Sequence, residues 1–408
     1  MKIAVIGGGA SGMLAAYSAA ENGASVTLFE KNEKLGKKLY ITGKGRCNFT
    51  NDTDVEGFLS NVVTNSKFLM SSIYGFTPQD CKNFFSEKMP IKTERGNRVF
   101  PVSDKSSDVI RCLENYCRSV GVKIRLNEKV RNISAENGKI IGITTVDGFF
   151  ECEKVIICTG GKSYPLTGSD GDGYRFALKT GHTLTDLNPG LVALNLKGDF
   201  YKSLQGLSLK NVRLSAESEG KKIYSEFGEM LFTHFGISGP IVLSLSSFIN
   251  KSDLKKVKLY LDLKPALTEE QLDARVLRDF EKFRNRALKN SLDELLPKAI
   301  IPVIMEKSGI PEDKKNTVIT SEERKNLIAA LKNFDMEVAS LRDFSEAIIT
   351  SGGVCVKEIN PKTMESKLVK GLYFAGEVLD VDALTGGFNL QIAFATGRAA
   401  GVNSAKED

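Results

Sequence analysis

Three glycines near the N-terminus have the spacing that binds the pyrophosphate of a dinucleotide. Gly7, Gly9 and Gly12 form a Gly-x-Gly-x-x-Gly motif between an apolar run at residues 2–6 and a helical run at residues 10–22. In such a motif the first glycine permits a tight turn, the second lets the pyrophosphate approach the backbone, and the third lets the helix pack on the strand. The N-terminus of the helix then offers unpaired N–H groups to the phosphates.

An acid completes this unit at the end of a second apolar run. The run covers residues 25–29, and Glu30 follows it, 18 positions after Gly12. This is close to the ~20 positions expected for an acid that binds the ribose hydroxyls. A glycine-rich turn that binds nothing is the weaker interpretation, because strand, turn, helix, strand and acid are all in place. Glu30 also disfavours a 2′-phosphate at this site by charge repulsion.

Three further stretches could contact a flavin dinucleotide. Residues 42–48 (TGKGRCN) combine small residues with cations, and Arg46 could hold a pyrophosphate or a substrate carboxylate, although a solvated basic loop is the alternative. Residues 159–161 (TGG) follow an apolar run, where backbone closes over a nucleotide. Residues 371–401 contain a glycine turn before an apolar helix that begins near Asn389, and the helix dipole would stabilise charge on a reduced flavin. FAD is therefore a better fit than NAD.

The residues predicted to bind FAD come from these four motifs and their flanks. They are Gly7, Gly9, Ala10, Ser11, Gly12, Glu30, Lys31, Thr42, Gly43, Arg46, Cys47, Asn48, Val130, Thr159, Gly160, Gly161, Gly376, Glu377, Asp382, Gly387, Asn389 and Leu390.

Few catalytic groups are predicted, because flavin chemistry needs mainly binding, orientation and electrostatics from the protein. Arg46 and His234 are the candidates, and a structural hydrogen-bonding role is the alternative for His234. His182 is expected to be a surface turn residue. The chain has seven cysteines without CxxC spacing and two histidines, so no metal site and no dithiol chemistry are predicted. Cys47 is expected to be a packed thiol.

The elements that position these groups predict a discontinuous α/β domain. Residues 1–190 and 345–408 form a Rossmann-like FAD-binding domain, residues 191–265 an inserted β domain, and residues 266–344 an inserted helical subdomain. Alternating apolar and polar residues support the β domain. The helical assignment covers residues 268–341, with expected capping boxes at Thr268/Gln271 and Ser291/Glu294.

Composition bounds the remaining possibilities. The net charge is +6, but basic and acidic residues are mixed along most of the chain, which is typical of a solvated surface and disfavours nucleic acid as a partner. No apolar run reaches the ~18 residues of a membrane span, and the N-terminus lacks signal-peptide features, so a cytoplasmic protein is expected. A second Gly-x-Gly-x-x-Gly with a following strand and acid is also missing. A nicotinamide would therefore be a transient visitor to a resident FAD.

Several stretches of the chain resemble the BaiN/YhiN-like flavoprotein family, and more distantly the fumarate reductase flavoproteins. The closest stretches are residues 42–51, 96–105, 167–182, 228–240 and 375–401. The resemblance implies a FAD domain with an inserted β-barrel and a small helical subdomain, in a FAD-dependent, NAD(P)H-linked oxidoreductase. It also implies bile-acid ene reduction or amine oxidation as activities. The chain departs from the family at Ala383, often glycine, and at Phe388, often tyrosine. Less backbone freedom is expected at Ala383.

The predicted function is FAD-dependent oxidation–reduction of a small organic substrate. Hydride transfer through flavin N5, as ene reduction with NAD(P)H as electron source, is the first hypothesis. An amine or amino-ketone oxidase that uses oxygen is the second. A flavin-containing RNA- or DNA-binding or sensor protein is the third, based on the lysines and arginines of residues 268–341. The sequence leaves the oligomeric state open.

Overall fold

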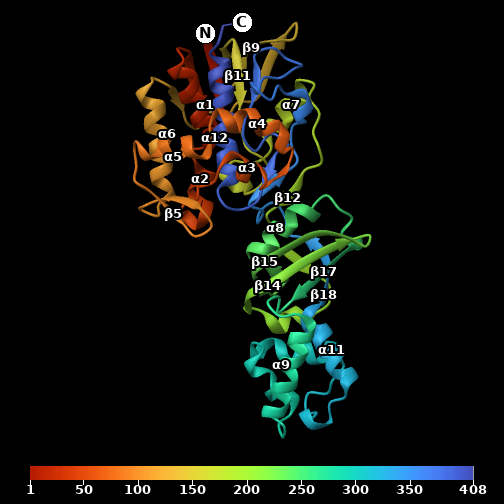
Figure 1. Cartoon of the computed structure of the whole chain (residues 1–408). Helices are drawn as coiled ribbons and strands as arrows, with labels where there is room; N and C mark the ends of the chain where they lie inside the picture. The colour runs from red at the N-terminus through yellow and green to blue at the C-terminus, as the bar shows by residue number, and fades with distance from the viewer. Residues whose placement is uncertain (408) are drawn as a thin grey trace. The chain divides into compact units, whose positions relative to one another are not determined.

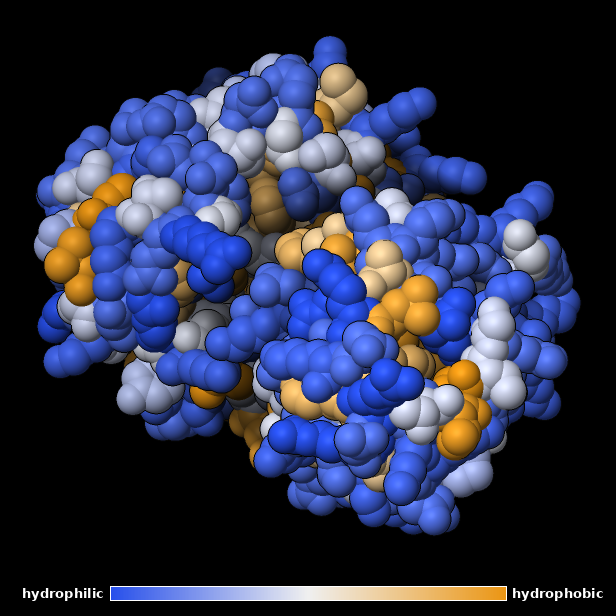
Figure 2. All heavy atoms as spheres, turned by 60° about the horizontal axis from the view of Figure 1, so that its bottom comes forward, coloured by the Kyte–Doolittle hydropathy of each residue, from blue (hydrophilic) through white to orange (hydrophobic). Residues whose placement is uncertain are grey.

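The computed structural model describes residues 1–407, which form two compact units. Met1–Gly190 and the residues from Phe344 onward make the first unit, and Leu191–Asp343 make the second. The predicted α/β fold, a Rossmann-like sheet with an inserted barrel, is confirmed. Within the described residues, no helix combines the length and the apolar character needed to span a bilayer. Figure 2 shows a largely hydrophilic face with small, separate apolar groups.

A parallel sheet organises the first unit (Figure 1). Its order is β20 (Leu372–Phe374), β11 (Lys154–Ile157), β1 (Lys2–Ile6), β2 (Ser25–Phe29) and β7 (Lys123–Arg125). The three central strands are short, mostly apolar and buried, as expected of parallel strands covered on both faces. The chain runs from β1 outward to both sides, so a ligand crevice is expected at the carboxyl end of β1.

Two helices rich in small residues pack closely beside this sheet. They are α1 (Ala10–Glu21) and α12 (Phe388–Ser404), which lie side by side in Figure 1. A Cβ added at Gly397 would lie 2.4 Å from the carbonyl oxygen of Ser11, and one at Gly401 would lie 2.4 Å from that of Ala15. The two glycines therefore permit the close approach of the helices.

The rest of the first unit consists of short helices and small sheets. The helices are α2 (Lys37–Ile41), α3 (Val55–Leu59), α4 (Ser66–Gly75), α5 (Pro78–Ser86), α6 (Ser106–Ser119) and α7 (Asp172–Lys179). The sheets are β8 (Asn132–Glu136) with β9 (Lys139–Thr144) and β10 (Phe149–Glu151), β3 (Thr50–Asn51) with β6 (Arg98–Pro101) and β5 (Ile91–Glu94), β4 (Val62–Thr64) with β21 (Asp382–Ala383), and β12 (Asn188–Gly190) with β19 (Ile349–Ser351).

The second unit is a closed barrel with attached helices. The barrel order is β13 (Leu194–Leu196), β16 (Gly236–Ser238), β15 (Lys221–Thr233), β14 (Ser208–Ser218), β17 (Val257–Asp262) and β18 (Phe334–Leu341). The helices are α8 (Pro240–Ile249), α9 (Glu269–Lys282), α10 (Ile301–Ser308) and α11 (Ser321–Lys332). Alternate residues of β17 and β18 point into an apolar core, which gives the barrel its interior.

The predicted helical stretch of residues 268–341 is wrong at its end. Residues 334–341 form β18, because Phe334, Met336 and Val338 are buried while the residues between them are exposed, a period of two rather than 3.6. The Thr268/Gln271 capping box is confirmed. The Ser291/Glu294 box is wrong, since Ser291 makes no cap and its hydroxyl donates to the carbonyl of Ala287.

Candidate functional site

The β1–α1 turn has open space at one glycine and close contacts at the other two. A Cβ at Gly7, whose φ is +105°, would lie 2.5 Å from the carbonyl oxygen of Cys158. A Cβ at Gly12 would lie 1.8 Å from the carbonyl oxygen of Gly7. A Cβ at Gly9 would meet no atom within 4 Å. The tight turn at Gly7, the free approach at Gly9 and the close packing at Gly12 thus follow the order that a pyrophosphate-binding motif requires.

The N-terminus of α1 lies open at this free approach. Gly9 is its N-cap and offers no side chain to the first N–H groups, and the first turn contains no acid. Ala10 and Ser11 begin the helix. A Cβ added at Gly376 would lie 2.5 Å from the Oγ of Ser11, so the two residues are close neighbours. The end of β20 therefore meets the start of α1, where unpaired backbone donors and the helix dipole favour an anion.

Glu30 is a buried acid that braces the glycine turn. Its Oε2 accepts a hydrogen bond from the Gly8 N–H at 2.7 Å. Its Oε1 accepts from the Asn32 backbone N–H at 2.8 Å and from Asn32 Nδ2 at 2.7 Å. A carboxylate offers roughly four acceptor positions, so capacity remains for a ribose hydroxyl. The backbone N–H groups of Gly8 and Asn32 therefore hold the Glu30 carboxylate in place.

Lys31 points into a cluster of charges at the start of α7. Its Nζ lies 2.7 Å from Asp170 and 3.1 Å from Asp172, and Lys129 and Arg175 each lie 3.1 Å from Asp172. Burial acts to raise the pKa of Asp172, but the lysines and the arginine outweigh it and lower that pKa to about 2. The cluster joins the strand end after β2 to α7. Lys31 therefore lies beside the predicted ribose site with its charge already paired.

Asp172→Asn is expected to lower stability at neutral pH but not in acid. A carboxyl with a lowered pKa stabilises the fold above its unfolded value and loses that contribution as the pH falls toward the folded value. Wild type should exceed the variant by about 1 kcal/mol of unfolding free energy above pH 5, allowing for solvent screening. Urea unfolding from pH 6 to pH 2 tests this. A difference that stays constant down to pH 2 would contradict it.

Arg46 ties the loop at residues 42–48 to two acids outside the loop. The Arg46 guanidinium donates to Glu94 at 2.5 Å and to Asp104 at 2.6 Å, and it lies 4.3 Å over the ring of Phe100. Its charge is thus engaged by two acids, and it anchors the loop. Burial raises the pKa of the Cys47 thiol to about 12, so Cys47 is a packed, protonated thiol in this loop.

Some buried side-chain oxygens in the predicted cofactor motifs make no hydrogen bond among the described residues. Asn48 Oδ1 and Thr159 Oγ1 are two such atoms. A buried polar atom left unsatisfied costs about 1–3 kcal/mol, so a polar ligand at these places would be stabilising. A Cβ at Gly387 would lie 2.9 Å from Asn48 Oδ1, which brings the loop and the start of α12 together. The orphaned atoms and the open turn at Gly9 both fit FAD.

The start of α12 offers a second helix N-terminus. Gly387 is its N-cap, with φ +95° and no capping side chain. The Asn389 side chain instead donates to the carbonyl of Ala383 at 2.7 Å and accepts from the Ala383 N–H at 3.0 Å. Ala383 has no left-handed φ, so alanine is accommodated there without strain. Leu390 lies partly buried in the first turn.

The remaining predicted cofactor residues lie in the same unit. Thr42 and Gly43 form the turn that follows α2, and Gly160 has a left-handed φ of +72°. Asp382 is buried in β21 and accepts a hydrogen bond from Ser351 Oγ at 3.1 Å. Val130 is buried between β7 and β8.

The two histidines have different environments from each other. His234 is exposed in the two-residue turn between β15 and β16, in the second unit. Arg46 belongs to the first unit, so neither unit contains both catalytic candidates. His182 is buried, not a surface residue as predicted, and its Nε2 lies 2.7 Å from Ser366 Oγ. Burial lowers the pKa of His182, which favours the neutral imidazole in a structural role.

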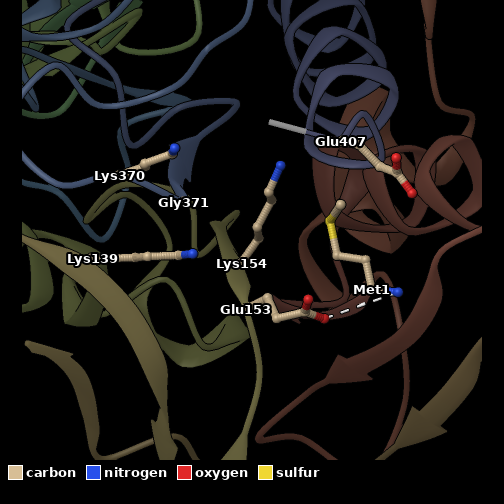
Figure 3. A pocket seen from close by; sticks show the side chains of 7 residues that line it. All are labelled: Met1, Lys139, Glu153, Lys154, Lys370, Gly371 and Glu407. Atoms are coloured by element: carbon tan, nitrogen blue, oxygen red, sulfur yellow. Dashed lines mark ion pairs between the residues drawn. The ribbon is translucent and has the colours of Figure 1, made fainter.

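A pocket at the opposite edge of the sheet is distinct from this site (Figure 3). It lies at the amino ends of β1, β11 and β20, and is lined by Met1, Lys139, Glu153, Lys154, Lys370, Gly371 and Glu407. Ligands of open parallel sheets bind outside the carboxyl ends of the strands. Inside the pocket the Met1 ammonium is 3.9 Å from Glu153, and Lys154 donates to the Lys406 carbonyl at 2.8 Å. Its charges thus partly neutralise one another.

The glycine turn, the buried acid Glu30 after β2 and the two open helix N-termini are features of a FAD-binding Rossmann-type protein. A family model described as "HI0933-like protein Rossmann domain" matches residues 1–403. The chain belongs to this HI0933-like family of flavoproteins. The predicted resemblance is confirmed, and with it the class of FAD-dependent oxidoreductase.

Curated relatives match along nearly their whole length. The chain is 32% identical to a 3-dehydro-bile acid delta(4,6)-reductase of Clostridium scindens, covering 98% of both chains. It is 30% identical to a ribosomal RNA dihydrouridine synthase of Haemophilus influenzae, covering 99% of this chain and 98% of the relative. A synthase of the same name from Escherichia coli is also 30% identical, with 96% and 95% covered.

Solved structures show the same fold at low sequence identity. A 3-ketosteroid-delta4-(5alpha)-dehydrogenase from Rhodococcus jostii RHA1 superposes with a TM-score of 0.56 at 15% identity, covering 99% of this chain and 96% of that one. The E. coli quinol fumarate reductase gives a TM-score of 0.53 at 16% identity, covering 99% of this chain and 70% of that one.

Proposed function

We propose that the protein reduces a carbon–carbon double bond conjugated with a carbonyl group, using FAD and electrons from NAD(P)H. The full-length relatives carry this proposal. One is named for reducing the delta(4,6) double bonds of a 3-dehydro bile acid, and the others for making dihydrouridine. Their substrates differ in size and class, but both names describe saturation of an alkene polarised by a carbonyl. The shared chemistry is therefore a better guide than either substrate.

The residues of the first unit would bind and orient the cofactor. The α1 N-terminus would hold the pyrophosphate, Glu30 the ribose, and the α12 N-terminus the flavin carbonyl edge. Once reduced by NAD(P)H, the bound flavin would supply a hydride from N5 to the electron-poor carbon of the alkene. The carbon next to the carbonyl then takes a proton.

His234 is a candidate from the sequence for the donor of this proton. A histidine imidazole can donate near neutral pH, and His234 is exposed. Arg46 is the weaker candidate, because a guanidinium does not release its proton in proteins and this one is paired with Glu94 and Asp104.

Uridine in ribosomal RNA is the second candidate substrate, favoured by the two synthases at 30% identity. The second unit carries one feature suited to RNA. Phe283 is partly exposed at the end of α9, with Lys282 4.9 Å and Arg286 4.7 Å from its ring. An aromatic ring beside cations can stack on a base while the cations contact the phosphates. Amine oxidation with oxygen has no comparable support among the full-length relatives.

Anaerobic reduction of the purified holoenzyme tests the electron source. NADH or NADPH is expected to bleach the flavin absorbance with one nicotinamide oxidised per flavin, and simple primary amines are expected to leave it unchanged. Bleaching by amines, with neither nicotinamide active, would overturn the proposal in favour of an oxidase.

A further inference from the structure

A polar network in the first unit ties together four separate segments of the chain. Lys38 of α2 donates to Ser163 Oγ at 2.5 Å and to Glu377 Oε2 at 2.6 Å. Glu377 Oε1 accepts from Ser163 Oγ and from the Thr350 N–H, both at 2.9 Å. Thr350 Oγ1 in turn accepts from the backbone N–H groups of Lys162 at 2.7 Å and Ser163 at 3.1 Å. The four segments follow β2, β11 and β20 or form β19.

This network is shielded from water at its centre. Ser163 and Thr350 are fully buried, and the Lys38 and Glu377 side chains are 24% and 23% exposed. Taking one partner out of a mostly buried ion pair leaves the other charge uncompensated, which is more harmful than losing an exposed pair. The negative charge of the Glu377 carboxylate is therefore compensated by the Lys38 ammonium.

The network also lies directly against a predicted cofactor loop. A Cβ at Gly161 would be 2.4 Å from Thr350 Oγ1 and 2.7 Å from Glu377 Oε1. Gly161 ends one loop assigned to FAD, and Glu377 belongs to another. The network thus sets how far apart these two loops lie.

We propose that Lys38 is a positioning residue of the FAD site. Its ammonium holds Glu377 and Ser163, and through them fixes the loop at residues 159–161 against Gly376-Glu377. Neighbouring lysines do not share this role: Lys37 pairs with Glu33 at 2.9 Å, and Lys34 lies 5.2 Å over the ring of Tyr40. The inference rests on FAD as the cofactor in the proposed function. It is independent of the substrate and of the electron donor.

FAD affinity and FAD release from purified holoenzyme test this role, read from the fluorescence of freed FAD. Lys38→Met is expected to weaken binding by about tenfold or more, while Lys38→Arg, which keeps a cation, stays within about threefold. Lys34→Met is the matched control and should bind FAD like wild type. These readouts do not require turnover. The Lys38 proposal can therefore fail while the enzyme reduces alkenes, and it can hold while the enzyme does not reduce alkenes.

A double-mutant cycle separates positioning from general destabilisation. If Lys38 acts through Glu377, Lys38→Met/Glu377→Gln should bind FAD no more weakly than the weaker single variant. Losses that multiply, or Lys38→Met with wild-type affinity, would overturn the proposal. Where Lys38→Met does not fold, Lys38→Gln replaces it, with wild-type affinity again the contradicting result. Circular dichroism during heating shows whether any loss of FAD merely follows unfolding.

Discussion

Gly12→Ala is expected to destabilise the protein strongly, whereas Gly9→Ala should remove FAD and leave the fold intact. The added methyl at Gly12 would lie 1.8 Å from the carbonyl oxygen of Gly7, a backbone atom that cannot move without opening the turn. Overpacking of this kind costs about 1–3 kcal/mol or more. Gly9 has φ −85° and free space around the new methyl, so alanine is unstrained there.

Comparing Gly9→Ala with Gly12→Ala separates the binding role of the turn from its role in packing. At Gly9 the methyl would occupy the space assigned to the pyrophosphate, and FAD affinity should fall by about tenfold or more. Urea unfolding and FAD titration of both variants measure the two effects. Equal loss of stability in both variants, or wild-type FAD affinity in Gly9→Ala, would show that the open space is not the pyrophosphate site.

Glu30→Gln is expected to weaken FAD binding by about tenfold and also to lower stability. Both carboxylate oxygens of Glu30 accept hydrogen bonds from N–H groups, one from Gly8 and the others from Asn32. An amide has one acceptor oxygen, so its NH2 group would face a donor on one side. An unsatisfied buried donor costs about 1–3 kcal/mol. The ribose would also lose a charged acceptor.

The neighbouring Glu33→Gln provides the control for this prediction. Glu33 is exposed and pairs with Lys37 at 2.9 Å, and exposed pairs contribute about 0–1 kcal/mol. FAD titration and urea unfolding should separate the two variants clearly. Equal FAD affinity of the Glu30→Gln and Glu33→Gln variants would show that Glu30 does not contact the cofactor.

Local patterns predicted the first βαβ unit correctly. Strand, turn, helix and the acid Glu30 lie within 30 residues, and each has a short-range cause: β-branched residues for the strands, Gly23 with φ +88° to end the helix, and crowding at Gly12. The helix predicted from local patterns for residues 334–341 was wrong, because these residues form β18. Their helix assignment overlooked a period-two pattern that only pairing with β13 and β17 makes decisive.

Contacts between distant positions could not be predicted from one sequence. Lys38 meets Ser163 and Glu377 across 125 and 339 positions, and in the sequence it is one of several lysines before residues 42–48. Arg46 matched a cation motif, but its partners Glu94 and Asp104 lie 48 and 58 positions away. A motif gives the type of a residue and its neighbours, whereas tertiary pairing decides whether its charge is available to a ligand.

Reoxidation of the reduced enzyme by an alkene tests the central claim most directly. The holoenzyme would be reduced without oxygen and mixed with cyclohex-2-enone, a 3-oxo-4-ene steroid or a uridine-containing ribosomal RNA fragment, with cyclohexene as the control. The account predicts that at least one conjugated substrate restores the flavin absorbance, with one double bond saturated per flavin, and that cyclohexene does not. Reoxidation by oxygen alone, with every conjugated substrate inert, would contradict it.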